Sequence, residues 1–162
     1  MRAAVITVSS SRSDGTRPDE SGPALAEFAR SIGAEVTAAE VVPDQQSKIE
    51  WALRHYADTG LCDLILTTGG TGFAPDDVTP EATRAVIERE APGIPEALRA
   101  ASREHTPNWM LSRGVAGIRG RCLIINFPGS PKAIGEAGES IGAAIPHAVS
   151  LLSDRVDQHD GR

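Results

Sequence analysis

Three glycines stand within four residues in the segment Thr67-Thr68-Gly69-Gly70-Thr71-Gly72. Such a run lets the backbone turn sharply and present successive N–H groups to one anion. The hydroxyl groups of Thr68 and Thr71 add donors. The segment is neither a Walker A loop, because no Gly-Lys-Ser/Thr follows, nor the Gly-x-Gly-x-x-Gly dinucleotide fingerprint. The residue types predict a phosphate-binding loop, and a structural turn without a ligand is the alternative.

Two aspartates are candidate metal ligands. Asp77 lies five residues beyond the glycine loop, and a carboxylate beside bound phosphates is unfavourable unless a magnesium ion lies between them. Asp44 follows Pro43, where it also suits the N-cap of a helix from Gln45. Two carboxylates flanking one site are the minimum set for magnesium with a nucleotide. The pair predicts such a site, with a surface acid and a helix cap as alternatives.

A second anion site is indicated by the segment Pro128-Gly129-Ser130-Pro131-Lys132. Pro128-Gly129 predicts a turn, Ser130 suits an N-cap, and Pro131 suits the first helical position. A helix N-terminus with a serine hydroxyl and a nearby lysine favours an anion. A plain strand-to-helix connection explains the proline and the serine equally well.

Hydrophobic spacing predicts the elements that position these motifs. Strands are expected at residues 3–8, 35–42 and 62–67, and a hairpin at 115–118 and 121–126 joined by Arg119-Gly120. Helices are expected at 21–32 and 45–59, from a Thr79 N-cap, and from Pro95 to about His105. A long helical segment reaches Leu152, and Pro146 should kink or break it. The alternation predicts an α/β fold with a mainly parallel sheet and helices on both faces.

The candidate residues all follow strands in this scheme. Ser9, Asp44, the 67–72 loop and residues 126–130 come directly after four different strands. In parallel sheets, ligands bind in the crevice beyond the carboxyl ends of the strands. We therefore expect these segments to converge on one edge.

Composition sets further bounds. The chain of 162 residues has 16 Lys+Arg against 22 Asp+Glu, a formal net charge of −6. This balance argues against nucleic acid as a partner. Neither a signal peptide nor a membrane-spanning run is seen, so we expect a soluble, cytoplasmic protein with no membrane partner. Cys62 and Cys122 are expected to be reduced thiols in the core.

Together and in this order, the glycine loop, the Asp77-Val78-Thr79-Pro80-Glu81-Ala82 segment and residues 128–132 resemble the Mog/MoaB molybdopterin-binding family. The same domain occurs as the G domain of gephyrin and, in variant form, in MoeA and CinA proteins. The resemblance runs from the first strand to about Leu152. It implies one molybdopterin-binding domain over residues 1–153, with a disordered tail at 154–162.

The resemblance also implies a three-layer α/β/α sandwich of MogA-like fold, usually a homotrimer, and an enzyme that transfers AMP from ATP to the terminal phosphate of molybdopterin with Mg²⁺. The two functional aspartates of the family fall on Asp44 and Asp77. The substrate pocket falls on residues 67–72, Ser9, Asp19 and the segment Pro128, Gly129, Ser130 and Lys132, with Glu81 as a weaker match. A transient contact with a MoeA-type molybdenum insertase is a further expectation.

Two other functions compete with this interpretation. A non-catalytic MoaB-type protein that only binds molybdopterin is the first; the presence of both acids favours the enzyme. A nicotinamide-dependent dehydrogenase is the second, and the missing dinucleotide fingerprint argues against it. The serine-rich loop after the first strand departs from the family pattern, which leaves the phosphate contacts of residues 9–12 open.

Overall fold

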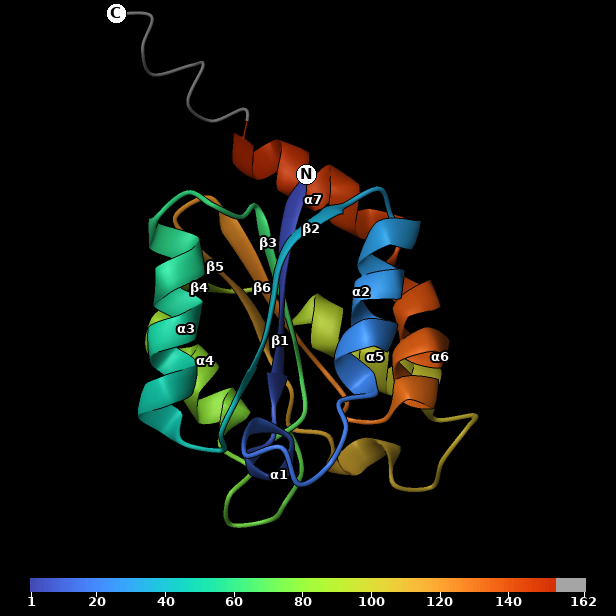
Figure 1. Cartoon of the computed structure of the whole chain (residues 1–162). Coiled ribbons are helices and arrows are strands. Elements are labelled where there is room, and N and C mark those ends of the chain that lie inside the picture. The colour runs from blue at the N-terminus through green and yellow to red at the C-terminus, as the bar shows by residue number, and fades with distance from the viewer. Residues whose placement is uncertain (154–162) are drawn as a thin grey trace, which may run out of the picture.

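A computed structural model describes residues 1–153 of the chain. One six-stranded sheet has the order β2-β1-β3-β6-β5-β4 (Figure 1). Its strands are β1 (Arg2–Val8), β2 (Glu35–Val42), β3 (Leu64–Thr68), β4 (Arg89–Glu90), β5 (Ala116–Arg119) and β6 (Cys122–Phe127). β2, β1, β3 and β6 are parallel neighbours, whereas β5 runs antiparallel to both of its neighbours. The predicted mainly parallel sheet is confirmed.

Helices cover both faces of the sheet, so the predicted three-layer α/β/α sandwich is also confirmed (Figure 1). One face carries α2 (Ser21–Ser31), α5 (Gly93–Ser102) and α6 (Pro131–Ile141), and α7 (Ala144–Ser153) joins the same core cluster. The other face carries α3 (Gln46–Asp58) and α4 (Thr79–Val86). Every residue of β3 and β6 is buried. Cover on both faces explains why these strands read as unbroken apolar runs rather than alternating ones.

The order of the strands creates a switch point at β1. From β1 the chain passes through α2 to β2 on one side, and then through α3 to β3 on the other side. The two helices lie on opposite faces of the sheet. A crevice at the carboxyl ends of β1 and β3 is the place where such folds bind ligands. The short helices α1 (Ser10–Ser13) and η1 (Trp109–Leu111) lie at this edge (Figure 1).

The opposite edge of the sheet holds both ends of the described chain. Met1 precedes β1, and its carbonyl oxygen accepts a hydrogen bond from the Glu35 N–H at 2.9 Å. Figure 1 shows the N-terminus beside α7, across the sheet from α1. The carboxyl edge is therefore free of both ends.

Three local predictions needed correction. The long helical segment is broken into two helices, but the break follows Ile141 instead of occurring at Pro146. Pro146 lies in the first turn of α7, where the missing N–H breaks no intrahelical bond. Thr79 is the first residue of α4 rather than its cap, which is Val78. In the confirmed hairpin, Arg119 pairs with Cys122, so the two connecting residues are Gly120 and Arg121 instead of Arg119 and Gly120.

Both cysteines are free and buried, as expected, and burial raises the pKa of each thiol. Within residues 1–153, no helix combines the length and the apolar character that a membrane crossing requires. The predicted tail at 154–162 lies outside the described residues.

Candidate functional site

The glycine loop follows β3 and crosses the end of β1. Gly69 and Gly70 adopt φ values of 94° and 66°, a region that side chains strongly disfavour. A Cβ on Gly69 would lie 2.4 Å from the Val8 carbonyl oxygen, and one on Gly70 would lie 2.3 Å from the Thr79 hydroxyl. Both positions therefore require glycine, for backbone conformation and for space.

All four carbonyl groups of the loop are bound by the protein. Thr79 donates its hydroxyl to the Gly69 oxygen at 2.9 Å and its N–H to the Gly70 oxygen at 3.0 Å. Arg113 donates its N–H to the Thr71 oxygen and its Nε to the Gly72 oxygen, both at 2.8 Å. Among residues 1–153, by contrast, the N–H groups of residues 69–72 donate to no protein acceptor. A loop with bound carbonyls and free N–H groups is a nest for an anion.

Arg113 is the residue that clamps this loop. Besides the Gly72 oxygen, its guanidinium donates to the Asp77 carbonyl oxygen at 2.6 Å and to both carboxylate oxygens of Glu81. The hydrogen bond from Arg113 holds the pKa of Glu81 below its ordinary value, and the same contact raises the pKa of Arg113. Glu81, the weaker of the family matches, thus acts on the loop through Arg113.

Asp77 lies against the glycine loop, as its position in the sequence suggested. Its Oδ2 accepts a hydrogen bond from the Ala74 N–H at 3.0 Å. A Cβ on Gly72 would lie 2.7 Å from the same oxygen, which puts the carboxylate in contact with the last glycine of the loop. The carboxylate is therefore held at the loop by a tight turn.

Asp44 is held at the end of β2 by α1. Its Oδ2 accepts from the Ser10 N–H at 2.7 Å, and its own N–H donates to the Ser10 hydroxyl at 3.0 Å. The alternative role as cap of the next helix is wrong, because Gln45 is the N-cap residue of α3. The carboxylate instead binds the positive end of α1. Ser9 is fixed beside it, because its N–H donates to the Val42 oxygen at 2.9 Å and its hydroxyl lies 3.3 Å from that of Ser11.

Asp19 stands at the start of α2. Its Oδ2 accepts from the Thr7 hydroxyl at 2.8 Å, and its Oδ1 accepts from the Gly22 N–H at 3.0 Å. These contacts cap the helix and join it to β1. They engage both carboxylate oxygens, so Asp19 shapes the edge around the site.

The two threonines before the glycines serve the fold. The Thr68 hydroxyl donates to the Pro128 oxygen at 2.7 Å, which joins the loop after β3 to the loop after β6. Thr67 is fully buried, and its hydroxyl accepts from the Asn126 amide at 3.0 Å. Asn126 also donates to the Thr83 hydroxyl at 3.0 Å and accepts from the Val115 N–H at 3.1 Å. This network fixes β3, α4 and the start of β5 beneath the loop.

The last motif lies beside the glycine loop. A Cβ on Gly129 would lie 3.4 Å from the Gly69 Cα, so the two loops are in contact. Ser130 is the N-cap of α6, as predicted, and accepts from the Ala133 N–H at 3.4 Å. The Lys132 ammonium lies 3.6 Å from Glu136 with 83% of the side chain exposed. The structure thus gives Lys132 an acidic partner on its own helix.

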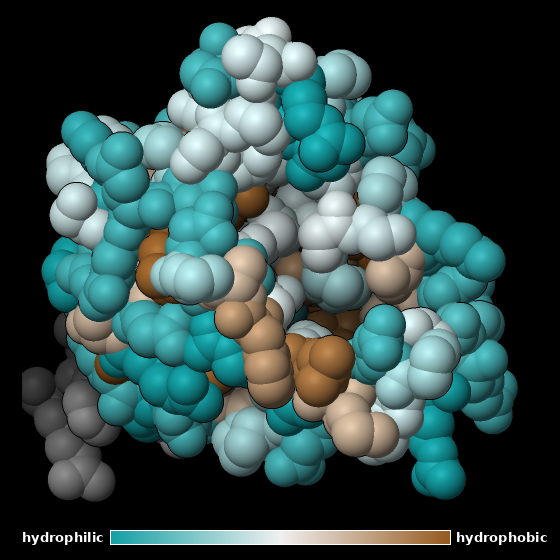
Figure 2. All heavy atoms as spheres, turned by 90° about the horizontal axis from the view of Figure 1, so that it is seen from below, coloured by the Kyte–Doolittle hydropathy of each residue, from teal (hydrophilic) through white to brown (hydrophobic). Residues whose placement is uncertain are grey.

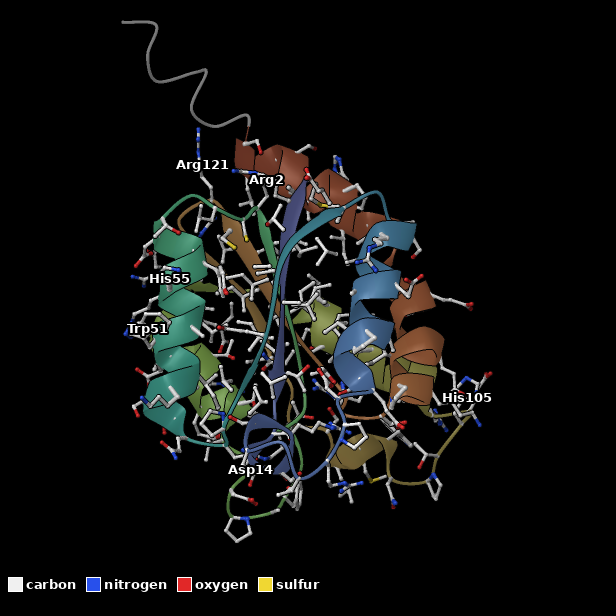
Figure 3. All side chains as sticks on the ribbon, viewed as in Figure 1. Arg2, Asp14, Trp51, His55, His105 and Arg121 are labelled. Carbon is white, nitrogen blue, oxygen red and sulfur yellow. The ribbon has the colours of Figure 1, made fainter. Side chains whose placement is uncertain are left out.

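The predicted segments therefore meet at one edge of the sheet. Figure 2 shows this edge from below, with a hollow at its centre and hydrophobic residues gathered beside it within a polar rim. Phe73, directly after the glycine loop, and Met110 and Leu111 in η1 are large exposed apolar residues of this edge. Asp14, at the end of α1, lies at the same edge, whereas Arg2 and Arg121 lie at the opposite one (Figure 3).

Sequence reasoning missed Arg113 and the role of Thr79 as a loop anchor, and it placed Asn126 at the predicted edge without its role in the buried hydrogen-bond network. Arg113 follows Ser112 after the apolar run Trp109-Met110-Leu111, and no motif includes it. One signal for this role of Asn126 is that a polar residue ends an otherwise apolar strand. Such a residue, when buried, must find hydrogen-bond partners.

Comparison with known sequences points to one family. The family described as "Probable molybdopterin binding domain" matches residues 4–147. The chain is 41% identical to the molybdopterin adenylyltransferase of Helicobacter pylori over 150 residues, which are 91% of this chain and 85% of that protein. It is 42% identical to the molybdenum cofactor synthesis protein cinnamon of Drosophila melanogaster over 94% of this chain, but spans only 26% of that longer protein.

Comparison with solved structures gives the same fold. The crystal structure of the molybdopterin biosynthesis enzyme MoaB from Thermus thermophilus matches with a TM-score of 0.88 and 47% sequence identity. The match covers 94% of this chain and 96% of that chain.

Proposed function

This chain belongs to the molybdopterin-binding family of molybdenum cofactor biosynthesis, and from that premise we propose that it is a molybdopterin adenylyltransferase. In this role it transfers AMP from ATP to the terminal phosphate of molybdopterin. One observation carries the proposal: the N–H groups of residues 69–72 have no acceptor within residues 1–153, while all four carbonyl groups of the same residues are bound. Such a nest suits a phosphate, and Asp77 lies against it.

The reaction makes simple demands on the protein. An oxygen of the molybdopterin phosphate attacks the α-phosphorus of ATP, a new P–O bond forms, the bond to the bridging oxygen breaks, and pyrophosphate leaves. The nucleophile is already an anion, so no general base is needed. Positioning and charge stabilisation are the main requirements. The nest holds the attacking phosphate, and Arg113 and Thr79 keep the nest in shape.

The donor set of this edge fits a magnesium ion. Asp44 and Asp77 each accept a hydrogen bond through Oδ2, which leaves Oδ1 of both without a hydrogen bond to residues 1–153. Carboxylate oxygens are the donors that Mg²⁺ prefers, usually together with substrate phosphates. Within the same residues, no group of three or more His, Cys, Asp or Glu side chains is arranged to hold a metal. Asp44 and Asp77 would therefore share the ion with ATP, where it would neutralise the triphosphate.

A second candidate function is molybdopterin binding without transfer. This function is favoured because both carboxylates already accept structural hydrogen bonds: Asp44 binds the start of α1, and Asp77 closes the turn at Ala74. Those contacts would preserve both acids even in a protein that binds no metal. Both functions use the nest to bind molybdopterin, and only the adenylyltransferase consumes ATP.

The test is incubation of the purified chain with molybdopterin, ATP and Mg²⁺. The adenylyltransferase produces adenylylated molybdopterin and pyrophosphate. Asp77→Asn is expected to abolish transfer and to leave molybdopterin binding largely intact, since an amide oxygen still accepts from the Ala74 N–H. Asp76→Asn is the matched control at the neighbouring exposed acid and should retain activity. Tight molybdopterin binding by the native chain with no ATP consumption would establish the binding protein instead.

We also propose a homotrimer and a transient contact with a MoeA-type molybdenum insertase, both carried over from the family. Exposed apolar side chains offer contact surfaces for a trimer interface and for the insertase. Trp51 is 63% exposed and stacks on His55 at 4.9 Å between ring centroids, on the outer face of α3 (Figure 3). Sedimentation velocity of the native chain and of Trp51→Ala tests the first proposal.

A further inference from the structure

A cavity of about 400 Å³ lies at the β4 edge of the sheet, between α4, α5 and the segment that leads into β5. Its charged lining residues are Arg84, Arg99, Arg113 and Glu90. Glu81, outside the lining, neutralises Arg113, so Arg84 and Arg99 against Glu90 leave an excess of one positive charge. This excess is notable in a chain whose formal net charge is −6.

Within residues 1–153, Arg84 and Arg99 have N–H donors without a strong protein acceptor. The Arg84 Nε lies 3.6 Å from the Glu90 carboxylate, with 54% and 62% of the two side chains exposed, and an exposed pair of this kind is weak. Arg99 donates only through Nη1 in the described chain, to the carbonyl oxygens of Ser112 at 3.5 Å and Gly114 at 3.1 Å. Its Nε and Nη2 therefore have no acceptor among these residues.

Arg113 contributes neither free donors nor net charge, because its guanidinium is bound to the glycine loop and paired with the Glu81 carboxylate. The cavity is thus a different place from the nest, although the two share one residue. Arg99 connects them, since it holds the carbonyl groups on either side of Arg113.

We propose that this cavity is a second anion site, which binds a small oligophosphate. The guanidinium fork matches phosphate oxygens in a bidentate manner. The cavity volume of about 400 Å³ falls within the range of about 300–1,000 Å³ for small-molecule sites. More than one arginine is available, which favours a ligand with at least two phosphate charges over a monoanion. Free pyrophosphate and the phosphate chain of a nucleotide share this chemistry.

The experiment is a calorimetric titration of the full chain with inorganic pyrophosphate, without Mg²⁺ or molybdopterin. Arg84→Gln should weaken binding about fivefold, because it removes one charged donor at a half-exposed position. Glu90→Gln should strengthen binding about threefold, because it removes the one carboxylate among the described residues that line the cavity. Arg89→Gln, with the same loss of charge on an exposed neighbour outside the lining, should bind as the native chain does.

Opposite responses to Arg84→Gln and Glu90→Gln, with Arg89→Gln unchanged, support the site. If the three variants bind pyrophosphate alike, or if Arg84→Gln and Arg89→Gln weaken it equally, the site is refuted. Neither result bears on adenylyl transfer, which Asp77→Asn tests separately. Repeating the titration with ADP identifies the source of the phosphate: tighter binding that keeps the dependence on Arg84 indicates a nucleotide, and equal or weaker binding indicates free pyrophosphate.

Discussion

Replacement of Arg113 by lysine is the sharpest test of the clamp on the glycine loop. The arginine binds the Gly72 oxygen at 2.8 Å, the Asp77 oxygen at 2.6 Å, and both carboxylate oxygens of Glu81. Lysine keeps the positive charge but replaces the planar fork with a single ammonium group. It can retain Glu81 or one carbonyl group, and it cannot hold all three partners in one geometry.

The expected loss follows from these contacts. A hydrogen bond from a charged donor contributes about 1.5–3 kcal/mol when its acceptor is shielded from water. The Arg113 and Glu81 side chains are 32% and 43% exposed, so their ion pair itself contributes less than about 1 kcal/mol. Loss of one carbonyl contact and of the bidentate geometry is therefore expected to raise the free energy of ordering the glycine loop by about 2 kcal/mol. If the ordered loop binds the phosphate as proposed, this cost corresponds to roughly thirtyfold weaker binding of molybdopterin.

The assay is molybdopterin affinity together with urea unfolding, for the native chain, Arg113→Lys and Glu81→Gln. Arg121→Lys is the matched control, because Arg121 is exposed at the opposite edge of the sheet (Figure 3). The double variant should lose less than the sum of the single variants, because the two side chains act on each other. If Arg113→Lys binds molybdopterin within about twofold of the native chain, the clamp does not order the loop and the reasoning is wrong.

Three further outcomes are expected. Gly69→Ala should destabilise the chain by about 2–3 kcal/mol in urea, since φ is 94° and the new Cβ would meet the Val8 oxygen; native stability would show that the loop can move aside. Asn126→Leu should cost about 3 kcal/mol in the same measurement, because three buried hydrogen bonds are lost, and a cost below about 1 kcal/mol would contradict the network. The pKa of Glu81 is lowered by Arg113, so the stabilisation it gives is present above its ordinary pKa of 4.5 and is lost as pH falls through the lower folded value. The unfolding free energy of the native chain, measured from about pH 3 to 7, should decrease at the acid end of this range, and it should decrease less in Glu81→Gln. An identical decrease in both proteins would count against the contact.

The meeting of the motifs at one edge could be predicted because it needs only two inferences. Alternating strands and helices imply a parallel sheet, and the carboxyl ends of parallel strands share an edge. The glycine loop, Asp44 and the segment at Gly129 each follow such a strand. This prediction did not depend on exact boundaries of helices and strands. It therefore holds although Thr79 is the first helical residue instead of the cap.

The contacts within the site could not be predicted, because they join residues that are distant in the sequence. Arg113 and Glu81 are 32 positions apart, and nothing near Arg113 distinguishes it from other surface arginines. Asp44 was considered as a cap for the helix that follows it, since capping preferences are local. The helix end that it binds begins 34 positions earlier, at Ser10. Only the folded sheet brings β1 and β2 together and offers that closer partner.

The position of Met1 and α7 across the sheet from the nest has a practical consequence. A chain immobilised on a sensor surface through its first residue would present the carboxyl edge to the solution. Ligand binding could then be recorded on the tethered protein without the attachment obstructing the hollow. The same arrangement means that a reporter fused ahead of Met1 should leave molybdopterin access unchanged.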